Sequence, residues 1–184
     1  GVRTGTERYR IIWLDQVKSW DEVYDLGRRF NVKSEVCDIR PYEDSARDHQ
    51  RKTRHRCYLA YYNTQAGTQD LIFNDELRTV KIDRTSICDR SQKVIDNGQV
   101  TIPRKCSMVD TFARQMANMG KVKDYNKRSG QVTYRYVSFG NGDDHFRHAL
   151  NYALVAAKHV GMESTSRREE ACEMAISDYD LVAV

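Results

Sequence analysis

The clearest amphipathic pattern in the chain reads Asp144-His145-Phe146-Arg147-His148-Ala149-Leu150-Asn151-Tyr152-Ala153-Leu154-Val155-Ala156-Ala157-Lys158-His159-Val160. Its apolar residues recur at the i, i+3, i+4 and i+7 spacing of one helix face. The predicted buried face consists of Phe146, Ala149, Leu150, Ala153, Leu154, Ala157 and Val160. A helix with such a face is expected to pack on a sheet.

Upstream of this helix, strand patterns and helix patterns follow one another. Apolar runs bounded by turn residues predict strands over residues 8–17, 32–39, 57–62, 71–73, 79–82 and 100–103. Helical spacing predicts helices over residues 20–30, 83–96 and 108–119, and the polar, basic residues 42–55 are also expected to be helical. Residues 8–39 therefore read as strand, helix and strand, which predicts a parallel pair joined by a right-handed crossover. Strands over 121–125 and 132–138 predict a β-hairpin just before the last helix, with basic residues near its tip.

Composition restricts the class of protein. The chain has 184 residues, a formal net charge of +4 and a mean hydropathy of −0.74, which fit one polar globular domain. No apolar run approaches the roughly 18 residues of a membrane helix, so no membrane span is predicted. The five cysteines form no Cys-x-x-Cys pair, which predicts neither a disulfide framework nor a zinc site and favours a reducing compartment with inert buried thiols.

The net charge is unevenly distributed. Residues 47–57 hold five basic residues against one acidic residue, and residues 121–135 hold the same numbers. The segment from Gly161 onward is acidic, with six carboxylates against two arginines. Clustered Lys and Arg attract phosphates, so the two basic segments are a candidate nucleic-acid footprint. On charge alone, solvated faces of a helix and a hairpin explain them equally well.

Aspartates stand at two positions where ligands are commonly held. Asp38 ends an apolar strand, and the carboxyl ends of strands in an open α/β sheet present ligand-binding groups. Asp143 and Asp144 begin the long helix, where a carboxylate is also favoured simply as a helix cap. Together, these aspartates provide the oxygen ligands that Mg²⁺ or Mn²⁺ requires.

Three motifs occur in a definite order along the chain. The run Val36-Cys37-Asp38-Ile39-Arg40-Pro41 forms a strand and an Asp-x-x-Pro turn, residues 95–103 form a helix, glycine and strand segment, and residues 142–153 hold an Asp-Asp pair followed by a small-residue helix. In this order the motifs resemble the nuclease domain of the large terminase subunit of tailed bacteriophages. The resemblance covers roughly residues 8–160.

The resemblance implies a ribonuclease H-like α/β fold, a mixed sheet flanked by helices with a basic hairpin before the last main helix. It implies a nuclease domain over residues 1–160, truncated at its N-terminus because the family's first metal-binding acid would precede Gly1, and a charged tail over 161–184. Asp38, Asp144 and the adjacent Asp143 would be the catalytic metal ligands for two Mg²⁺ or Mn²⁺ ions that hydrolyse a DNA phosphodiester. His148, on the same helix face as Asp144, is a possible auxiliary residue, although a solvent-facing histidine is the plainer interpretation.

The resemblance also gives the basic segments a role and suggests partners. The expected contacts to double-stranded DNA are made by Arg47, Arg51, Lys52, Arg54, Lys121, Lys123, Lys127 and Arg128. The family implies an endonuclease that cuts concatemeric DNA with little sequence preference in the host cell cytoplasm. Its partners would be the ATPase domain of the parent chain, the portal protein and the small terminase subunit. A non-catalytic DNA-binding or docking module, and a resolvase or transposase type of nuclease core, are the alternatives.

Overall fold

The computed structural model of the chain describes residues 8–54, 56–63, 70–104, 106–125, 130, 132–140 and 142–161. The predicted tail over 161–184 lies outside these residues except for Gly161. Within the described part of the chain, no helix combines the length and the apolar composition needed to cross a bilayer.

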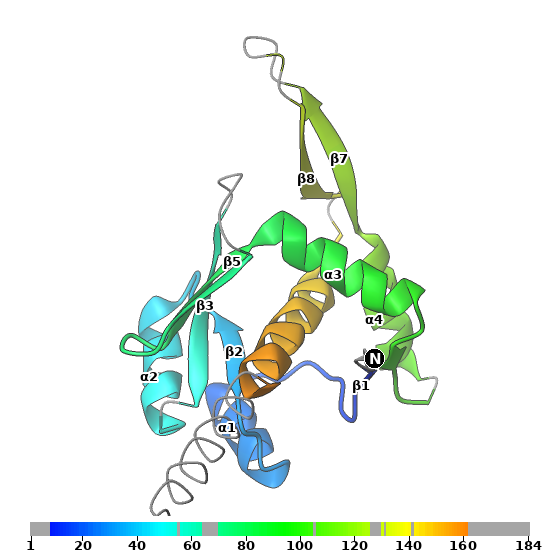
Figure 1. Ribbon diagram of the computed structural model, residues 1–184. Coiled ribbons are helices and arrows are strands. Elements are labelled where there is room, and N and C mark those ends of the chain that lie inside the picture. The colour runs from blue at the N-terminus through cyan, green and yellow to red at the C-terminus, as the bar shows by residue number, and fades with distance from the viewer. Residues whose placement is uncertain are drawn as a thin grey trace, which may run out of the picture.

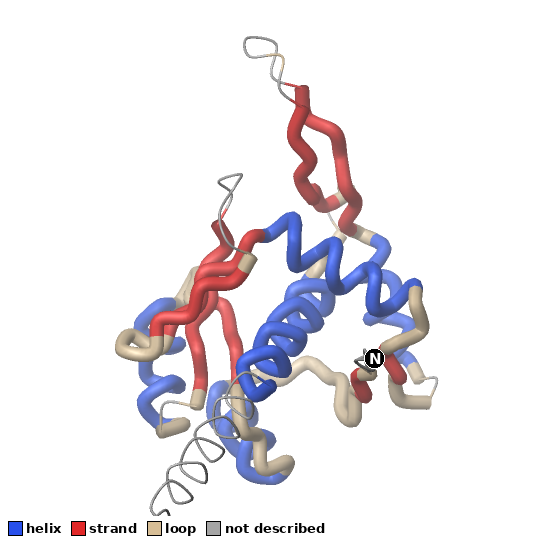
Figure 2. The backbone as a smooth tube through the Cα atoms, in the orientation of Figure 1, coloured by secondary structure: helices blue, strands red, loops and turns tan. Residues whose placement is uncertain are grey.

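Strands and helices alternate along most of the chain, as the sequence patterns predict (Figures 1 and 2). The strands are β1 (Tyr9–Arg10), β2 (Glu35–Asp38), β3 (Cys57–Asn63), β4 (Leu71–Asn74), β5 (Thr79–Asp83), β6 (Val100–Thr101), β7 (Met119–Tyr125) and β8 (Val132–Ser138). The helices are α1 (Trp20–Arg29), α2 (Glu43–Lys52), α3 (Arg84–Asp96), α4 (Ser107–Ala117) and a long helix over residues 145–161.

The main sheet is mixed, with strand order β2-β3-β5-β4. β2, β3 and β5 are parallel, and β4 runs antiparallel to β5. Side chains alternate between the two faces of β3, so Cys57 and Leu59 pack with α2 while Tyr58 and Ala60 pack with the core that includes the 145–161 helix. The predicted α/β fold, a mixed sheet flanked by helices, is confirmed, and it is compatible with a ribonuclease H-like arrangement.

The predicted strand over residues 8–17 is wrong beyond its first residues. Only Tyr9 and Arg10 form β1, which pairs in parallel with β6 and not with β2. Beyond β1, Ile11 and Leu14 pack against the core, but Ile12 is 64% exposed and the segment forms no further strand pairing among the described residues. The parallel pair with a helical connection is instead β2 and β3, joined through α2.

The predicted hairpin is confirmed. β7 and β8 are antiparallel, with Lys121 opposite Tyr136 and Lys123 opposite Tyr134. The hairpin extends away from the main sheet in Figure 1. Tyr134 accepts a hydrogen bond at its carbonyl from Thr85 Oγ1, which ties β8 to the start of α3.

The long helix is confirmed, but its predicted buried face is partly wrong. Phe146, Leu150 and Leu154 are buried, whereas Val160 and the alanines at 149, 153 and 157 are exposed. The buried stripe instead includes polar residues, which are Arg147, Asn151, Tyr152 and His159. Larger side chains bury more surface than alanine, so the helix turns them inward wherever their polar atoms find partners.

Candidate functional site

The carboxyl ends of the three parallel strands β2, β3 and β5 lie at the same end of the main sheet. Asp38 is the last residue of β2, Asn63 of β3 and Asp83 of β5, and the register pairs Asn63 with Asp83. Asp83 is already engaged, because its Oδ1 accepts a hydrogen bond from Ser86 N and caps α3. Open α/β sheets bind ligands at the carboxyl ends of their strands.

Both carboxylate oxygens of Asp38 accept hydrogen bonds. Oδ1 accepts from Arg40 N at 2.9 Å, and Oδ2 accepts from the Tyr152 hydroxyl at 2.7 Å. Burial, followed by the neighbouring Tyr62 and Asp38, raises the pKa of Tyr152 far above its ordinary value. The hydroxyl therefore stays protonated and fixes the carboxylate from the 145–161 helix.

His148 lies between the sheet and Asp144. Asn151 Nδ2 donates to the Tyr62 hydroxyl at 3.3 Å, and that hydroxyl lies 2.7 Å from His148 Nδ1. The Tyr62 hydroxyl therefore joins Asn151 and His148 in one hydrogen-bonded chain. Burial lowers the pKa of His148 despite the opposing effect of Asp144, so the ring is neutral at pH 7. His148 is thus not solvent-facing.

Asp144 lies next to His148, with 3.6 Å between Asp144 Oδ2 and His148 Nε2. The Ser138 hydroxyl donates to the same carboxylate oxygen. Burial raises the pKa of Asp144, but the Ser138 hydrogen bond, the charge of His148 in the acidic range where that ring is protonated, and the charge of Arg84 outweigh it and leave the pKa below its ordinary value. Asp144 is consequently a carboxylate at neutral pH, held by the hairpin and its own helix.

Arg84 is the nearby cation. Its guanidinium lies 5.6 Å from the centre of the Tyr62 ring, and its Nε is buried with no hydrogen-bond partner among the described residues. The charge of Arg84 helps to lower the pKa of both Asp144 and His148. A positive side chain beside a carboxylate is suited to attract an anionic group such as a phosphate.

Asp143 differs from its neighbour. Its side chain is 69% exposed and lies 3.8 Å from His145 Nε2, whereas the Asp144 side chain is 19% exposed. The Asp143 backbone carbonyl accepts from Asn118 Nδ2. Of the two adjacent acids, only Asp144 faces the residues that surround Asp38.

The structure brings Asp38 and Asp144 into one network without direct contact. Tyr152 joins Asp38 to the long helix, and the stacked rings of Tyr152 and Tyr62 lead to His148 and then Asp144. Asp38 is close enough to His148 to act on its pKa. Among the described residues, the group of three or more ligand atoms close enough to hold one metal ion is a different one, formed by Glu35, His49 and Cys57.

The basic residues of α2 lie away from this network. α2 runs back from the carboxyl end of β2, so its last turn lies beside Arg56 and the start of β3. This is the amino-terminal end of the strands, opposite to the end that carries Asp38. Three of the predicted DNA contacts form pairs with acids, which are Arg47 with Glu43, Arg51 with Asp48 and Lys52 with Asp21. Arg54 is exposed. Their role in DNA binding stays a prediction.

The hairpin holds the other predicted contacts. Lys121 Nζ lies 2.6 Å from Asp89 of α3, and Lys123 is exposed on the same face of β7. Lys127 and Arg128 lie outside the described residues. Since Ser138 at the end of β8 contacts Asp144, the hairpin is continuous with the candidate site.

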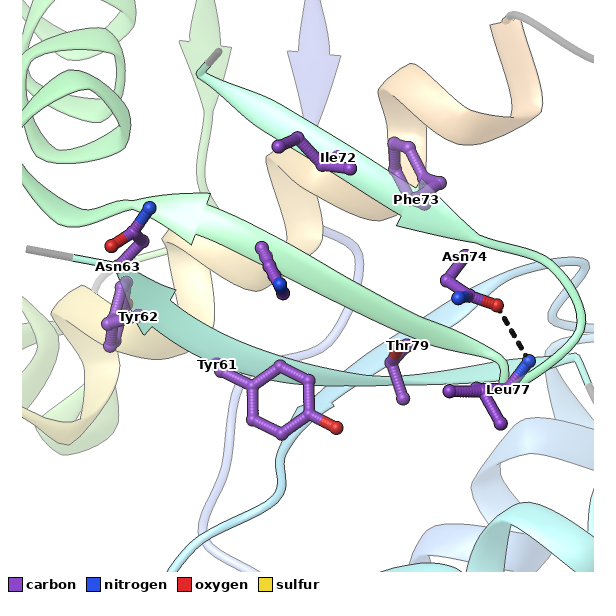
Figure 3. Close-up of a pocket in the computed structure, with 9 residues that line it drawn as sticks. Tyr61, Tyr62, Asn63, Ile72, Phe73, Asn74, Leu77 and Thr79 are labelled. Carbon is purple, nitrogen blue, oxygen red and sulfur yellow. Dashed lines mark hydrogen bonds between the residues drawn. The ribbon is translucent and has the colours of Figure 1, made fainter. Parts of the chain in front are cut away.

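A groove lies on the α2 side of the sheet, over the strands that α2 leaves uncovered (Figure 3). Its volume is about 550 Å³. Tyr61, Ile72 and Lys81 contribute from three adjacent strands. Tyr61 points into this groove while the hydroxyl of Tyr62 belongs to the network around His148, so the two tyrosines serve opposite faces of the sheet.

Sequence reasoning missed the tyrosines and Asn151 of the network. The signal was a polar stripe at helical spacing, because residues 144, 148, 151 and 152 share one side of the helix. It also missed the Glu35, His49 and Cys57 group, whose members come from three separate elements.

Comparison of the chain with known protein families, with curated proteins and with solved structures found no match. The functional argument therefore depends on the residues themselves.

Proposed function

We propose that this chain is a metal-dependent DNA endonuclease domain, of the kind found in the large terminase subunit of tailed bacteriophages. The observation that carries the proposal is the network that links Asp38 and Asp144, which are 106 positions apart in the sequence, through Tyr152, Tyr62 and His148. The order of motifs around both aspartates provides additional support.

The donor set fits Mg²⁺ or Mn²⁺. Mg²⁺ is commonly held by one or two carboxylates together with water and substrate phosphate, so a site with two described aspartates is chemically sufficient for one ion. A second ion would need further ligands. Such ions supply charge stabilisation at the phosphate and lower the pKa of an attacking water.

The surrounding residues would hold the two carboxylates in place. Tyr152 orients Asp38, while Ser138 and His148 orient Asp144. Arg84 adds positive charge beside these acids, where the phosphodiester would lie. Lys123 and its neighbours on the hairpin would contact the DNA backbone, which positions a duplex without reading its sequence.

The direct test is cleavage of supercoiled plasmid by the purified chain. We expect nicked and linear products with Mn²⁺ or Mg²⁺, and none after the divalent ions are removed with a chelator, because the carboxylates alone do not activate water. Agarose gel electrophoresis measures the products. Cutting that persists unchanged in excess chelator would contradict the proposal.

A non-catalytic DNA-binding module is the second candidate. It is favoured by the finding that, among the described residues, Asp38 and Asp144 belong to no three-ligand group. This candidate predicts retarded migration of duplex DNA on a native gel together with no cleavage in any divalent metal. The cleavage assay and the gel therefore distinguish the two functions.

Replacing Tyr152 with Phe should raise the metal concentration needed for half-maximal cutting about 10- to 100-fold, because outer partners of metal ligands have effects of that size. The matched control is Tyr136→Phe, which removes a similar hydroxyl from a carboxylate, that of Asp89, at the base of the hairpin. Titration of Mn²⁺ in the plasmid assay measures the shift. Equal metal requirements in both variants would exclude an orienting role for Tyr152.

A further inference from the structure

A second cluster of ligand-type side chains lies under α2, on the opposite face of the sheet from the 145–161 helix. Glu35 and Cys37 project from the same face of β2, Cys57 lies on β3, and His49 lies on α2. His49 Nε2 is 2.9 Å from Glu35 Oε2, and the Sγ atoms of Cys37 and Cys57 are 3.5 Å apart. Ligand atoms of Glu35, His49 and Cys57 all lie within 4.8 Å of one another, whereas Cys37 is outside that group and adjoins it through Cys57.

These spacings are close to the edges of a tetrahedral zinc site. Zn–S bonds of about 2.3 Å place two sulfur ligands roughly 3.8 Å apart, and Zn–N and Zn–O bonds of about 2.0–2.1 Å place the other pair roughly 3.3 Å apart. The observed separations of 3.5 and 2.9 Å differ from these by a few tenths of an ångström. Binding would also require the sulfur atoms to lie roughly 3.6 Å from the His49 nitrogen and the Glu35 oxygen, and the Cys37 side chain would have to rotate furthest because it is outside the 4.8 Å group.

The cluster is enclosed and has an outer shell. The His49 side chain is 1% exposed, and its ring stacks on Trp20 of α1 with 4.8 Å between ring centres. Glu35 uses Oε2 toward His49 and accepts a hydrogen bond at Oε1 from Arg56 Nε at 2.8 Å. An outer partner that orients a ligating carboxylate while leaving its second oxygen available is typical of metal sites.

The glycine of α1 allows this enclosure. A Cβ at Gly27 would lie 2.2 Å from Arg56 Nη2 and 2.8 Å from Glu35 Oε1. The absence of a side chain at position 27 therefore lets α1 close over the Glu35 and Arg56 pair. Trp20 and Gly27 thus both contribute to the covering of the cluster by α1.

The charges balance if a divalent ion is bound. Two thiolates and one carboxylate carry three negative charges, and one Zn²⁺ with the Arg56 guanidinium carries three positive charges. A buried group of charges is tolerated when it is paired and neutral as a whole. Two sulfur ligands with one imidazole favour zinc over Mg²⁺ or Mn²⁺, which prefer oxygen ligands.

We propose that this cluster is a structural Zn²⁺ site whose ligands are Glu35, Cys37, His49 and Cys57. The site joins β2 to β3 and α2. Because Cys37 immediately precedes Asp38, it fixes the end of the edge strand that carries the aspartate. The proposal does not depend on the nuclease assignment, since a structural zinc would tie these elements together in any protein with this fold.

The test uses the full chain, purified under reducing conditions and supplied with zinc chloride. We expect one zinc per chain after dialysis, measured by elemental analysis, and a lower melting temperature after chelation. Replacement of zinc by Co²⁺ should produce the near-ultraviolet thiolate-to-cobalt charge-transfer band of a cysteine-ligated ion. A chain that takes up no zinc and gives no such band would overturn the proposal.

Variants locate the ion. The double variant Cys37→Ser/Cys57→Ser should bind zinc more than about 100-fold more weakly, because loss of an outer partner alone costs 10- to 100-fold. Cys106→Ser is the matched control, since Cys106 is an exposed free cysteine outside the cluster. Unchanged affinity in the double variant would overturn the assignment. If that variant does not fold by circular dichroism, the single variant Cys37→Ser, which alters a less buried ligand, provides the same comparison.

Discussion

Asp144→Asn should reduce metal-dependent DNA cutting roughly a thousandfold, whereas Asp143→Asn should leave it within about twofold of the unaltered chain. A metal ligand contributes several kcal/mol of charge stabilisation, and each 1.36 kcal/mol corresponds to a factor of ten in rate. Asp144 is partly buried, accepts from Ser138 and faces His148. Asp143 has the same chemistry and adjoins it in the chain, but its side chain is mostly exposed.

Asp38→Asn should have the same large effect as Asp144→Asn. Asparagine keeps the shape of the side chain and one acceptor oxygen, so it removes the negative charge and one of the two hydrogen bonds that Asp38 accepts. Single-turnover plasmid cleavage measures the rate, and thermal unfolding checks that each variant is folded. If Asp143→Asn and Asp144→Asn lose equal activity, the choice of Asp144 over Asp143 is wrong. Activity unchanged by both Asp38→Asn and Asp144→Asn would exclude the proposed metal site.

The sequence was sufficient to predict most of the elements, because local patterns determine them. Ser19 caps α1 by accepting from Glu22 N, and Asp83 caps α3 in the same way. The continuous apolar and aromatic run of β3, whose first four residues are all buried, predicts a strand covered on both faces. This reasoning fails for residues 11–17, because an apolar run becomes a longer strand only where a partner strand is available.

The candidate site was only partly predictable. Asp38 and Asp144 could be identified because they stand at a strand end and a helix start, which are positions with a known physical role. Tyr152 could not be assigned to Asp38, because the contact depends on how far the helix is rotated over the sheet. The zinc ligands lack the close Cys-x-x-Cys spacing that makes such sites visible in a sequence, since adjacent strands and a helix bring them together.

Arg147 explains much of that helix rotation, because a charged residue is buried on the face that packs against the rest of the protein. Its side chain is 1% exposed. Nη1 donates to Gln92 Oε1 at 2.9 Å, and Nη2 donates to the Cys88 carbonyl at 3.2 Å. The guanidinium also lies 5.5 Å from the centre of the Tyr136 ring. These contacts join the 145–161 helix to α3 and to the hairpin.

We expect Arg147→Ala to lower the free energy of unfolding by about 3–5 kcal/mol. The change leaves a cavity and removes donors from a buried carbonyl and an amide, and each of these effects is strongly destabilising. Arg147→Met fills more of the volume and should cost less, because only the hydrogen bonds and the ring contact are then lost. Urea denaturation followed by circular dichroism measures the differences.

Arg135→Ala is the control for the loss of an arginine as such. Arg135 is 64% exposed and pairs with Asp124 across the hairpin, so its removal should cost less than about 1 kcal/mol. If Arg147→Ala lowered the free energy of unfolding by no more than Arg135→Ala does, the buried guanidinium would not stabilise the helix. The predicted order, in which Ala costs more than Met at position 147 and both cost more than Ala at position 135, separates burial from charge. The contacts of Arg147 also explain why a polar residue is buried at a position that the apolar pattern alone would assign to solvent.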